Sequence, residues 1–347
     1  AITLVNVVLA IVLWIGFDLS EQGMQFVERV EWMPTFGIQY AVGVDGISLL
    51  LVLLTSVLPP LCVLGSWDSI TSRLKAFMML ILLVEGAMLV VFMALDAFLF
   101  FMLWEVTMIP MYFMIVLWGG PDRVAAGMKY VIYSLTGSLL LLVGILGLSL
   151  QAGTFDILML AEHDYSQNSQ LWIFLALFLG FAIKLPMLPF HTWLPDAHSE
   201  APTAGSVLLA GVLLKMGGYG LIRFCLPIFP EVAIQFAPFL LWLSVAGILY
   251  GGYMALAQSD LKRLVAYSSV SHMGFVTLGI FSFNNEGLEG AILQMMTHGL
   301  TTGAMFLIVG QLYDRTHSRE IGDYGGLYKR MPRFVAVLSL FAVASFG

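Results

Sequence analysis

Charged residues are scarce in this chain. Asp, Glu, Lys and Arg make up 11% of its 347 residues, whereas hydrophobic residues make up 60%. Soluble domains carry about a quarter charged residues, so the composition excludes an ordinary soluble protein. An isoelectric point near 5.3 also excludes a basic surface for binding nucleic acid.

Cysteines and nucleotide-binding motifs are also scarce. Cys62 and Cys225 are too few for a disulfide framework or for the four thiolates of an iron–sulfur cluster. No Gly-x-Gly-x-x-Gly motif follows an expected strand, and no phosphate-binding loop is present. We therefore expect that this chain binds no cofactor or metal, and that any redox chemistry belongs to partner chains.

Long apolar runs make up most of the sequence, and most of them reach the roughly 20 residues that cross a bilayer core of about 30 Å. The expected spans lie near residues 2–17, 46–66, 75–95, 97–118, 130–150, 171–189, 203–225, 238–257, 264–281, 288–312 and from 334 onward. The sequence therefore predicts an all-α polytopic membrane protein. Because it begins and ends inside apolar runs, we expect a fragment with ten or eleven visible spans.

The basic residues of the loops are distributed unevenly. Eleven fall in one set of alternate loops, two (Arg29 and Arg223) fall in the other set, and Lys184 and Lys215 remain inside apolar spans. The positive-inside rule places the eleven in the cytoplasm or its organelle equivalent. We expect a multi-pass protein of the bacterial inner (plasma) membrane, with the mitochondrial inner membrane as the alternative.

Ionisable residues at membrane depth are expensive and usually functional. Lys184 and Lys215 lie deep in their expected spans, and Glu105 lies deep in an earlier span. Desolvation disfavours a charged ammonium and a nearby carboxylate favours it. A Glu105–Lys184 pair that moves together or apart would therefore change the proton affinity of the lysine. The alternative is a static buried ion pair that fixes helix packing.

Prolines interrupt the chain between the two buried lysines, at Pro186, Pro189, Pro195 and Pro202. Proline removes a backbone donor and frees carbonyl groups. Broken backbone is tolerated in a membrane where it lines a protein-enclosed or hydrated site, and transporters build ion sites from it. An ordinary helix end followed by a tight loop is the alternative.

Two histidines extend the set of candidate proton carriers. His298 has Gln294, Thr301 and Thr302 at helical spacing, and His272 has Ser268 one turn before it. Polar faces that point inward from several spans would form a hydrated axis along which histidine relays protons. Polar groups that only join neighbouring helices are the alternative.

The segments 134–138 and 299–303 show weak internal sequence similarity at an offset of 165 residues. Paired five-helix units of inverted topology are a common transporter architecture. We therefore predict N-terminal spans over residues 1–73, a first five-helix repeat over 74–230 and a truncated second repeat over 231–347.

Several segments resemble one known family closely. They are Phe-Phe-Met-Leu-Trp-Glu-Val-Thr-Met-Ile-Pro-Met-Tyr-Phe at 100–113, the run 184–206, Leu-Leu-Lys-Met-Gly-Gly-Tyr-Gly at 213–220, Asp-Leu-Lys-Arg-Leu-Val-Ala-Tyr-Ser-Ser at 260–269 and Tyr-Asp-Arg-Thr-His at 313–317. These segments resemble the antiporter-like proton-pumping subunits of respiratory complex I. The Trp-Glu and Tyr-Asp-Arg-Thr-His segments favour its chain M (subunit 4) group over chains L and N.

The resemblance implies an antiporter-like bundle in which Glu105, Lys184, Lys215, His272 and His298 carry protons. It implies that the chain is part of an enzyme, a proton-translocating NADH:quinone oxidoreductase. The sister chains L and N and other membrane-arm subunits would be its partners. Flavin and iron–sulfur clusters would lie in partner subunits, which would also handle NADH and quinone.

Other functions remain open from the residues alone. A subunit of a cation/proton antiporter or of a membrane hydrogenase complex would share much of this pattern. A structural membrane scaffold that moves no ion belongs to another class, and it predicts that Met can replace Lys184 and Lys215 without loss of pumping.

Overall fold

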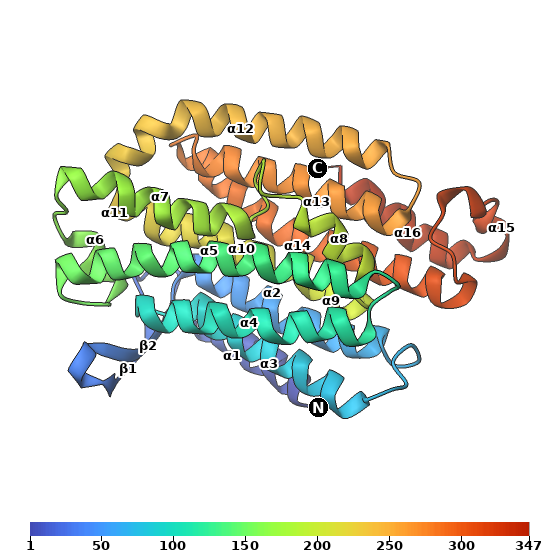
Figure 1. Ribbon diagram of the computed structural model, residues 1–347. Helices are drawn as coiled ribbons and strands as arrows, with labels where there is room; N and C mark the ends of the chain where they lie inside the picture. The colour runs from blue at the N-terminus through green and yellow to red at the C-terminus, as the bar shows by residue number, and fades with distance from the viewer. Residues whose placement is uncertain (347) are drawn as a thin grey trace.

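The computed structural model describes residues 1–346, and they form a bundle of long helices that lie side by side (Figure 1). The long helices are α1 (Ile2–Gly16), α2 (Gly46–Gly65), α3 (Leu74–Met93), α4 (Ala97–Trp118), α5 (Arg123–Ala152), α7 (Gln167–Lys184), α9–α11 (Thr203–Ile228), α12 (Pro230–Leu256), α13 (Leu261–Ile280), α14 (Asn285–Thr316) and α16 (Pro332–Ala344). Each coincides with one of the eleven expected spans. Within residues 1–346, seven of them are long and apolar enough to cross a membrane by that criterion alone.

Polar residues begin many of these helices. Asp96 accepts hydrogen bonds from the N–H groups of Phe98 and Leu99, both at 2.9 Å, and so caps α4. Side chains in the same position cap further helices: Asp45 on α2, Asp156 on α6 (Ile157–Glu162), Asp260 on α13 and Asn284 on α14. Such caps satisfy backbone donors that have no partner inside the helix, and they set where each span begins.

The continuous element α9–α11 lies at the centre of the bundle and is buried along its apolar window. It is not a regular α-helix, because π-helical turns η2 (Leu209–Leu213) and η3 (Leu221–Cys225) flank the α-helical segment α10 (Leu214–Gly220). Such turns release carbonyl groups from the regular ladder and are frequent at functional sites. Lys215 is the second residue after the first of them.

The chain is broken where the prolines predict it. Helix α7 ends at Lys184, the short helix α8 (Trp193–Glu200) follows the break, and α9 (Thr203–Leu208) begins after Pro202. Between α7 and α8, the Leu188–Pro189 peptide bond is cis. The break brings a short helix into the bundle between its two halves, where it contacts α5 and α13.

A two-stranded hairpin was not expected from the sequence and is an addition to the all-α prediction. Strands β1 (Gln25–Met33) and β2 (Ile38–Val44) pair antiparallel around η1 (Pro34–Phe36), and Gly37 takes the left-handed conformation at the turn (φ 68°). The segment is rich in β-branched and aromatic residues but lies between spans. It projects from the end of the bundle opposite α15 (Leu327–Arg330) (Figure 1).

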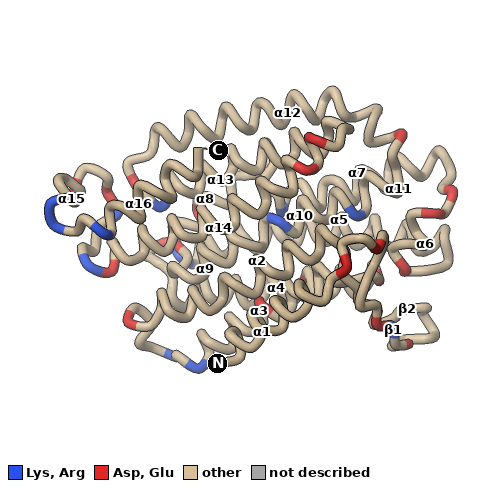
Figure 2. The backbone as a smooth tube through the Cα atoms, turned by 180° about the vertical axis from the view of Figure 1, so that it is seen from behind, with Lys and Arg blue, Asp and Glu red and all other residues tan. Residues whose placement is uncertain are grey.

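Charges lie mainly at the two ends of the bundle. Lys and Arg gather toward the α15 end and Asp and Glu toward the α6 end, and few charges lie along the middle (Figure 2). This is the pattern expected when the helices cross the bilayer and the basic end faces the cytoplasm or matrix.

Candidate functional site

Lys215 and His298 form the centre of the candidate site. Lys215 is fully buried, and its Nζ lies 2.6 Å from Nδ1 of His298 on α14, which is also buried. The same Nζ donates to the carbonyl of Ala210, in the π-helical turn one turn earlier. The lysine is therefore held by a neutral acceptor and a second base, and not by a carboxylate.

His272 continues the line from His298. The two imidazole rings lie 5.3 Å apart between centroids and nearly perpendicular to each other. Among the described residues, Nδ1 of His272 and Nε2 of His298 have no hydrogen-bond partner. Both rings line a cavity of about 730 Å³ between α13, α14 and the end of α16. Two buried bases, Lys215 and His298, and the half-buried His272 thus lead from the centre of the bundle to a cavity.

Lys184 lies in a different environment. It is buried, and its Nζ lies 5.6 Å from the ring centroids of both Trp104 on α4 and Tyr130 on α5. Aromatic faces attract a cation, more strongly when both are desolvated. Nε1 of Trp104 in turn donates to the hydroxyl of Ser138 on α5 at 3.3 Å.

Glu105 follows Trp104 on α4, but it does not form an ion pair with Lys184. Among the described residues Oε1 of Glu105 is buried without a hydrogen-bond partner, and no ion pair includes it. The expected pair is therefore separated in this structure, with aromatic rings around the lysine. Lys184 and Lys215 are not hydrogen-bonded to each other either.

His198 is a candidate that the analysis of the sequence did not single out. It lies on α8, it is fully buried, and it stacks on Phe306 with a centroid distance of 4.5 Å. Neither of its ring nitrogens has a hydrogen-bond partner among residues 1–346. The available signal was a histidine within a proline-broken membrane segment, which favours a functional position over a solvated loop.

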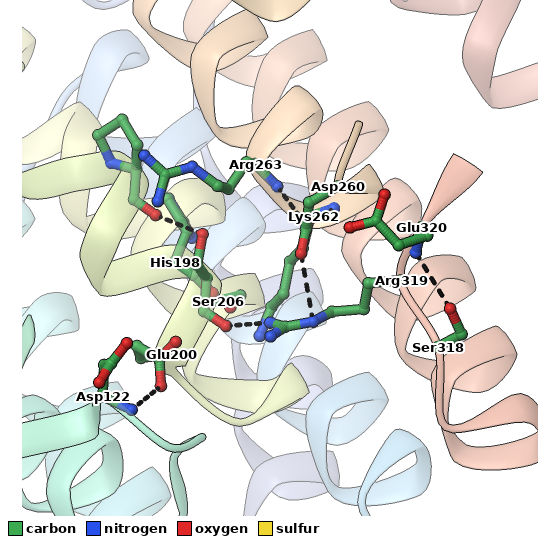
Figure 3. Close-up of polar contacts among 12 residues, drawn as sticks. Asp122, His198, Glu200, Ser206, Asp260, Lys262, Arg263, Ser318, Arg319 and Glu320 are labelled. Carbon is green, nitrogen blue, oxygen red and sulfur yellow. Dashed lines mark hydrogen bonds and ion pairs between the residues drawn. The ribbon is translucent and has the colours of Figure 1, made fainter. Parts of the chain in front are cut away.

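Lys262 was expected in a cytoplasmic loop and is instead buried. It lies in the first turn of α13, and its Nζ donates to the carbonyl of Ala201 at the end of α8. Arg319 donates to the carbonyl of Ser199, in the last turn of the same helix (Figure 3). The expectation failed because hydropathy places a helix end but does not show which neighbouring backbone covers it.

The described residues contain no group of three or more His, Cys, Asp or Glu side chains that could hold a metal ion. The site is thus built from lysines, histidines, one carboxylic acid and aromatic rings. Such groups can bind, hold and pass protons.

Comparison with known proteins agrees with this architecture. Residues 94–347 match the family described as NADH:quinone oxidoreductase/Mrp antiporter, TM. The chain is 47% identical over 358 residues to NADH-quinone oxidoreductase subunit M of Rhodobacter capsulatus, covering 99% of this chain and 69% of the relative. It is also 47% identical over 339 residues to NADH-ubiquinone oxidoreductase chain 4 of Chondrus crispus, covering 97% and 69%.

A solved structure shows the same fold. A chain of respiratory complex I from Thermus thermophilus with bound NADH superposes with a TM-score of 0.88 at 33% sequence identity, covering 99% of this chain and 78% of that chain. This agreement confirms the antiporter-like bundle and the resemblance on which it was predicted. The chain belongs to the antiporter-like membrane subunits of the NADH:quinone oxidoreductase and Mrp family, in its subunit M (chain 4) group.

Proposed function

We propose that this chain translocates protons in the membrane arm of an NADH:quinone oxidoreductase. The contact between Lys215 and His298 carries the proposal, because two bases 2.6 Å apart are buried together without a carboxylate. Two adjacent positive charges in a poorly solvated interior repel strongly. The pair therefore holds one excess proton at a time, and that proton can pass from one base to the other.

The proposed path runs through the five predicted residues. Glu105 and Lys184 form the first part, Lys215 and His298 the centre, and His272 leads on to the cavity between α13 and α14. The separation of Glu105 from Lys184 sets the proton affinity of the lysine. When redox-driven movement changes this separation, Lys184 passes its proton toward Lys215.

Partner subunits supply the energy in this proposal. Relatives of this chain are named as subunits of NADH-quinone and NADH-ubiquinone oxidoreductases, and we infer the same assembly here, with sister chains L and N in the membrane arm. NADH, flavin, iron–sulfur clusters and quinone belong to other subunits.

Two alternatives differ from this proposal. A subunit of a cation/proton antiporter or of a membrane hydrogenase complex would use the same buried bases, and the matching family includes Mrp antiporters. A scaffold without ion transport is less consistent with the site, because buried charged groups are costly and packing alone is served as well by apolar residues.

The experiment is NADH-driven proton uptake into vesicles that contain the assembled complex, in wild type and in Lys215→Ala. We expect NADH oxidation and proton uptake to fall together by at least about tenfold, since the loss of a proton carrier costs 10²–10⁴-fold in typical cases. Lys75→Ala is the matched control, because Lys75 is exposed and has no ion-pair partner among the described residues.

Wild-type rates in assembled Lys215→Ala complex would contradict the proposal. Sodium-dependent proton exchange without NADH would instead favour the antiporter alternative.

A further inference from the structure

Helix α8 exposes only one face. Of its eight residues, Asp196 and Glu200 are the two that are not buried, and they lie one turn apart. This spacing places both carboxylates on the same side of the helix. The outer face of α8 is thus acidic, while its other residues pack into the bundle.

Asp196 binds cations from both halves of the chain. Its Oδ2 lies 2.7 Å from Nζ of Lys129 on α5, and its Oδ1 lies 3.3 Å from a guanidinium nitrogen of Arg263 on α13. No other carboxylate in residues 1–346 pairs with two cations. We call Lys129, Asp196 and Arg263 the Asp196 triad.

Hydrogen bonds to neighbouring segments hold the C-terminal end of α8. The carboxylate of Glu200 accepts a hydrogen bond from the N–H of Asp122 at 2.9 Å, at the start of α5. On the opposite side, Lys262 and Arg319 donate to carbonyls at the end of α8 (Figure 3). Cations at the carboxyl end of a helix also suit its dipole. Helix α8 is therefore tied to both halves of the bundle.

The inner face of α8 packs beside the proposed proton path. Nε1 of Trp193 donates to the carbonyl of Ile183 at 3.0 Å, directly before Lys184, and its ring lies 5.5 Å from Tyr130. His198, in the last turn of the same helix, is fully buried and stacks on Phe306 of α14. A tilt of α8 would therefore move the surroundings of Lys184 and His198 together.

We propose that Asp196 is a positioning residue, which binds Lys129 of the first half and Arg263 of the second and so orients α8 beside the buried proton carriers. The proposal rests on the proposed proton-translocating function and deepens it. Each member of the triad is about one-third exposed, so the ion pairs contribute little to stability. Their effect on rate is larger, because a displacement of about 1 Å can cost as much as 10²-fold.

The test is Asp196→Asn, which keeps the size of the side chain and removes its charge. NADH oxidation and proton uptake are measured per assembled complex in vesicles. We expect both to fall about three- to tenfold, and we expect Asp196→Glu to restore at least half of the wild-type rate. The double variant Lys129→Gln with Arg263→Gln is expected to reproduce the loss. Asp68→Asn, an exposed carboxylate without an ion-pair partner among residues 1–346, is the matched control and keeps the wild-type rate.

Wild-type rates in assembled Asp196→Asn complex would overturn the proposal, and so would a loss that Asp196→Glu does not relieve. Where Asp196→Asn fails to assemble, Lys129→Gln and Arg263→Gln singly give the same comparison: intermediate rates support the triad and wild-type rates in both overturn it. If Lys215→Ala abolishes proton uptake while Asp196→Asn leaves it unchanged, the positioning role fails and the proton path stands. If Lys215→Ala has no effect, the proposed function itself fails.

Discussion

At the scale of single residues, the chain buries lysines without giving them carboxylate partners. Lys184 faces aromatic rings, Lys215 contacts a histidine and a carbonyl, and Lys262 contacts a carbonyl. Burying an unpaired charge is expensive, and a buried amine relieves that cost by releasing its proton. Such positions suit exchange of protons better than they suit rigid packing.

The sequence predicted part of this arrangement. Lys184 and Lys215 were placed inside the bundle correctly, because hydropathy around them is high over a full span. The direct pairing of Glu105 with Lys184 is not present in this structure. Such a pairing depends on how the helices cross and on which side chains surround the lysine, here Trp104 and Tyr130. Local sequence does not encode that geometry.

Asp45 gives a prediction at the residue scale, because it caps α2 and pairs with Arg223 of the central element. Burial raises the pKa of Asp45, but the Arg223 ion pair and the N–H of Ser48 outweigh it and hold the pKa below its usual range. Asn is also a good helix cap, so Asp45→Asn removes only the ion pair. The pair is partly exposed, so its loss should cost less than that of a fully buried pair and more than that of a surface pair, about 1–2 kcal/mol of stability at pH 7.

The pH dependence of that loss follows from the sign of the shift. Because the pKa of Asp45 is lower in the folded state, the ion pair stabilises the protein fully at pH values above the unfolded pKa of about 3.9. This stabilisation is lost as the pH falls through the folded-state pKa. Thermal unfolding of wild type and Asp45→Asn in detergent should therefore differ at pH 7 and converge below about pH 4. An equal difference at both pH values would show that the ion pair is not responsible.

At the scale of elements, small residues allow the central helix to lie close to its neighbours. A Cβ on Gly220 would lie 2.2 Å from the ring of Phe181, and one on Gly217 would lie 2.8 Å from that residue's carbonyl oxygen. A cluster of glycines in an apolar span favours such a close-packing face over a phosphate loop. The helix interface between α7 and α10 confirms it.

Gly220→Ala tests this interface. The added methyl group forces Phe181 or the backbone to move, and overpacking of this kind costs about 1–3 kcal/mol. Gly86→Ala on α3 is the matched control, because nothing lies within 4 Å of its added Cβ and Ala favours the helix. We expect thermal unfolding in detergent to occur at a lower temperature for Gly220→Ala only; equal midpoints for both variants would refute close packing there.

Two elements could not be predicted from their sequences. The hairpin β1–β2 is rich in strand-forming residues, but it lies between spans and its two strands pair with each other. Strand propensity depends strongly on context, so this signal alone did not predict the hairpin. Helix α8 has only eight residues and a proline in its first turn. It is held by Lys129, Lys262, Arg263 and Arg319, which are distant in sequence.

At the scale of the whole molecule, composition and the length of the apolar runs predicted most of the fold. All eleven expected spans are helices in the structure, because a bilayer requires each backbone group to be satisfied within its own segment. The separation of basic from acidic ends agrees with the predicted topology (Figure 2). The boundaries of the two predicted repeats remain predictions.

The central claim is that protons pass through this chain on its buried bases, and Lys184→Met tests it most directly. Methionine keeps the length and the apolar stem of the side chain, and replacing a buried ionic group by an apolar one is often neutral for stability. The measurement is NADH-driven proton uptake per assembled complex in vesicles. The account predicts that the complex assembles and that its proton uptake and NADH oxidation fall at least about tenfold. Wild-type uptake in Lys184→Met would contradict it and leave this chain as a scaffold.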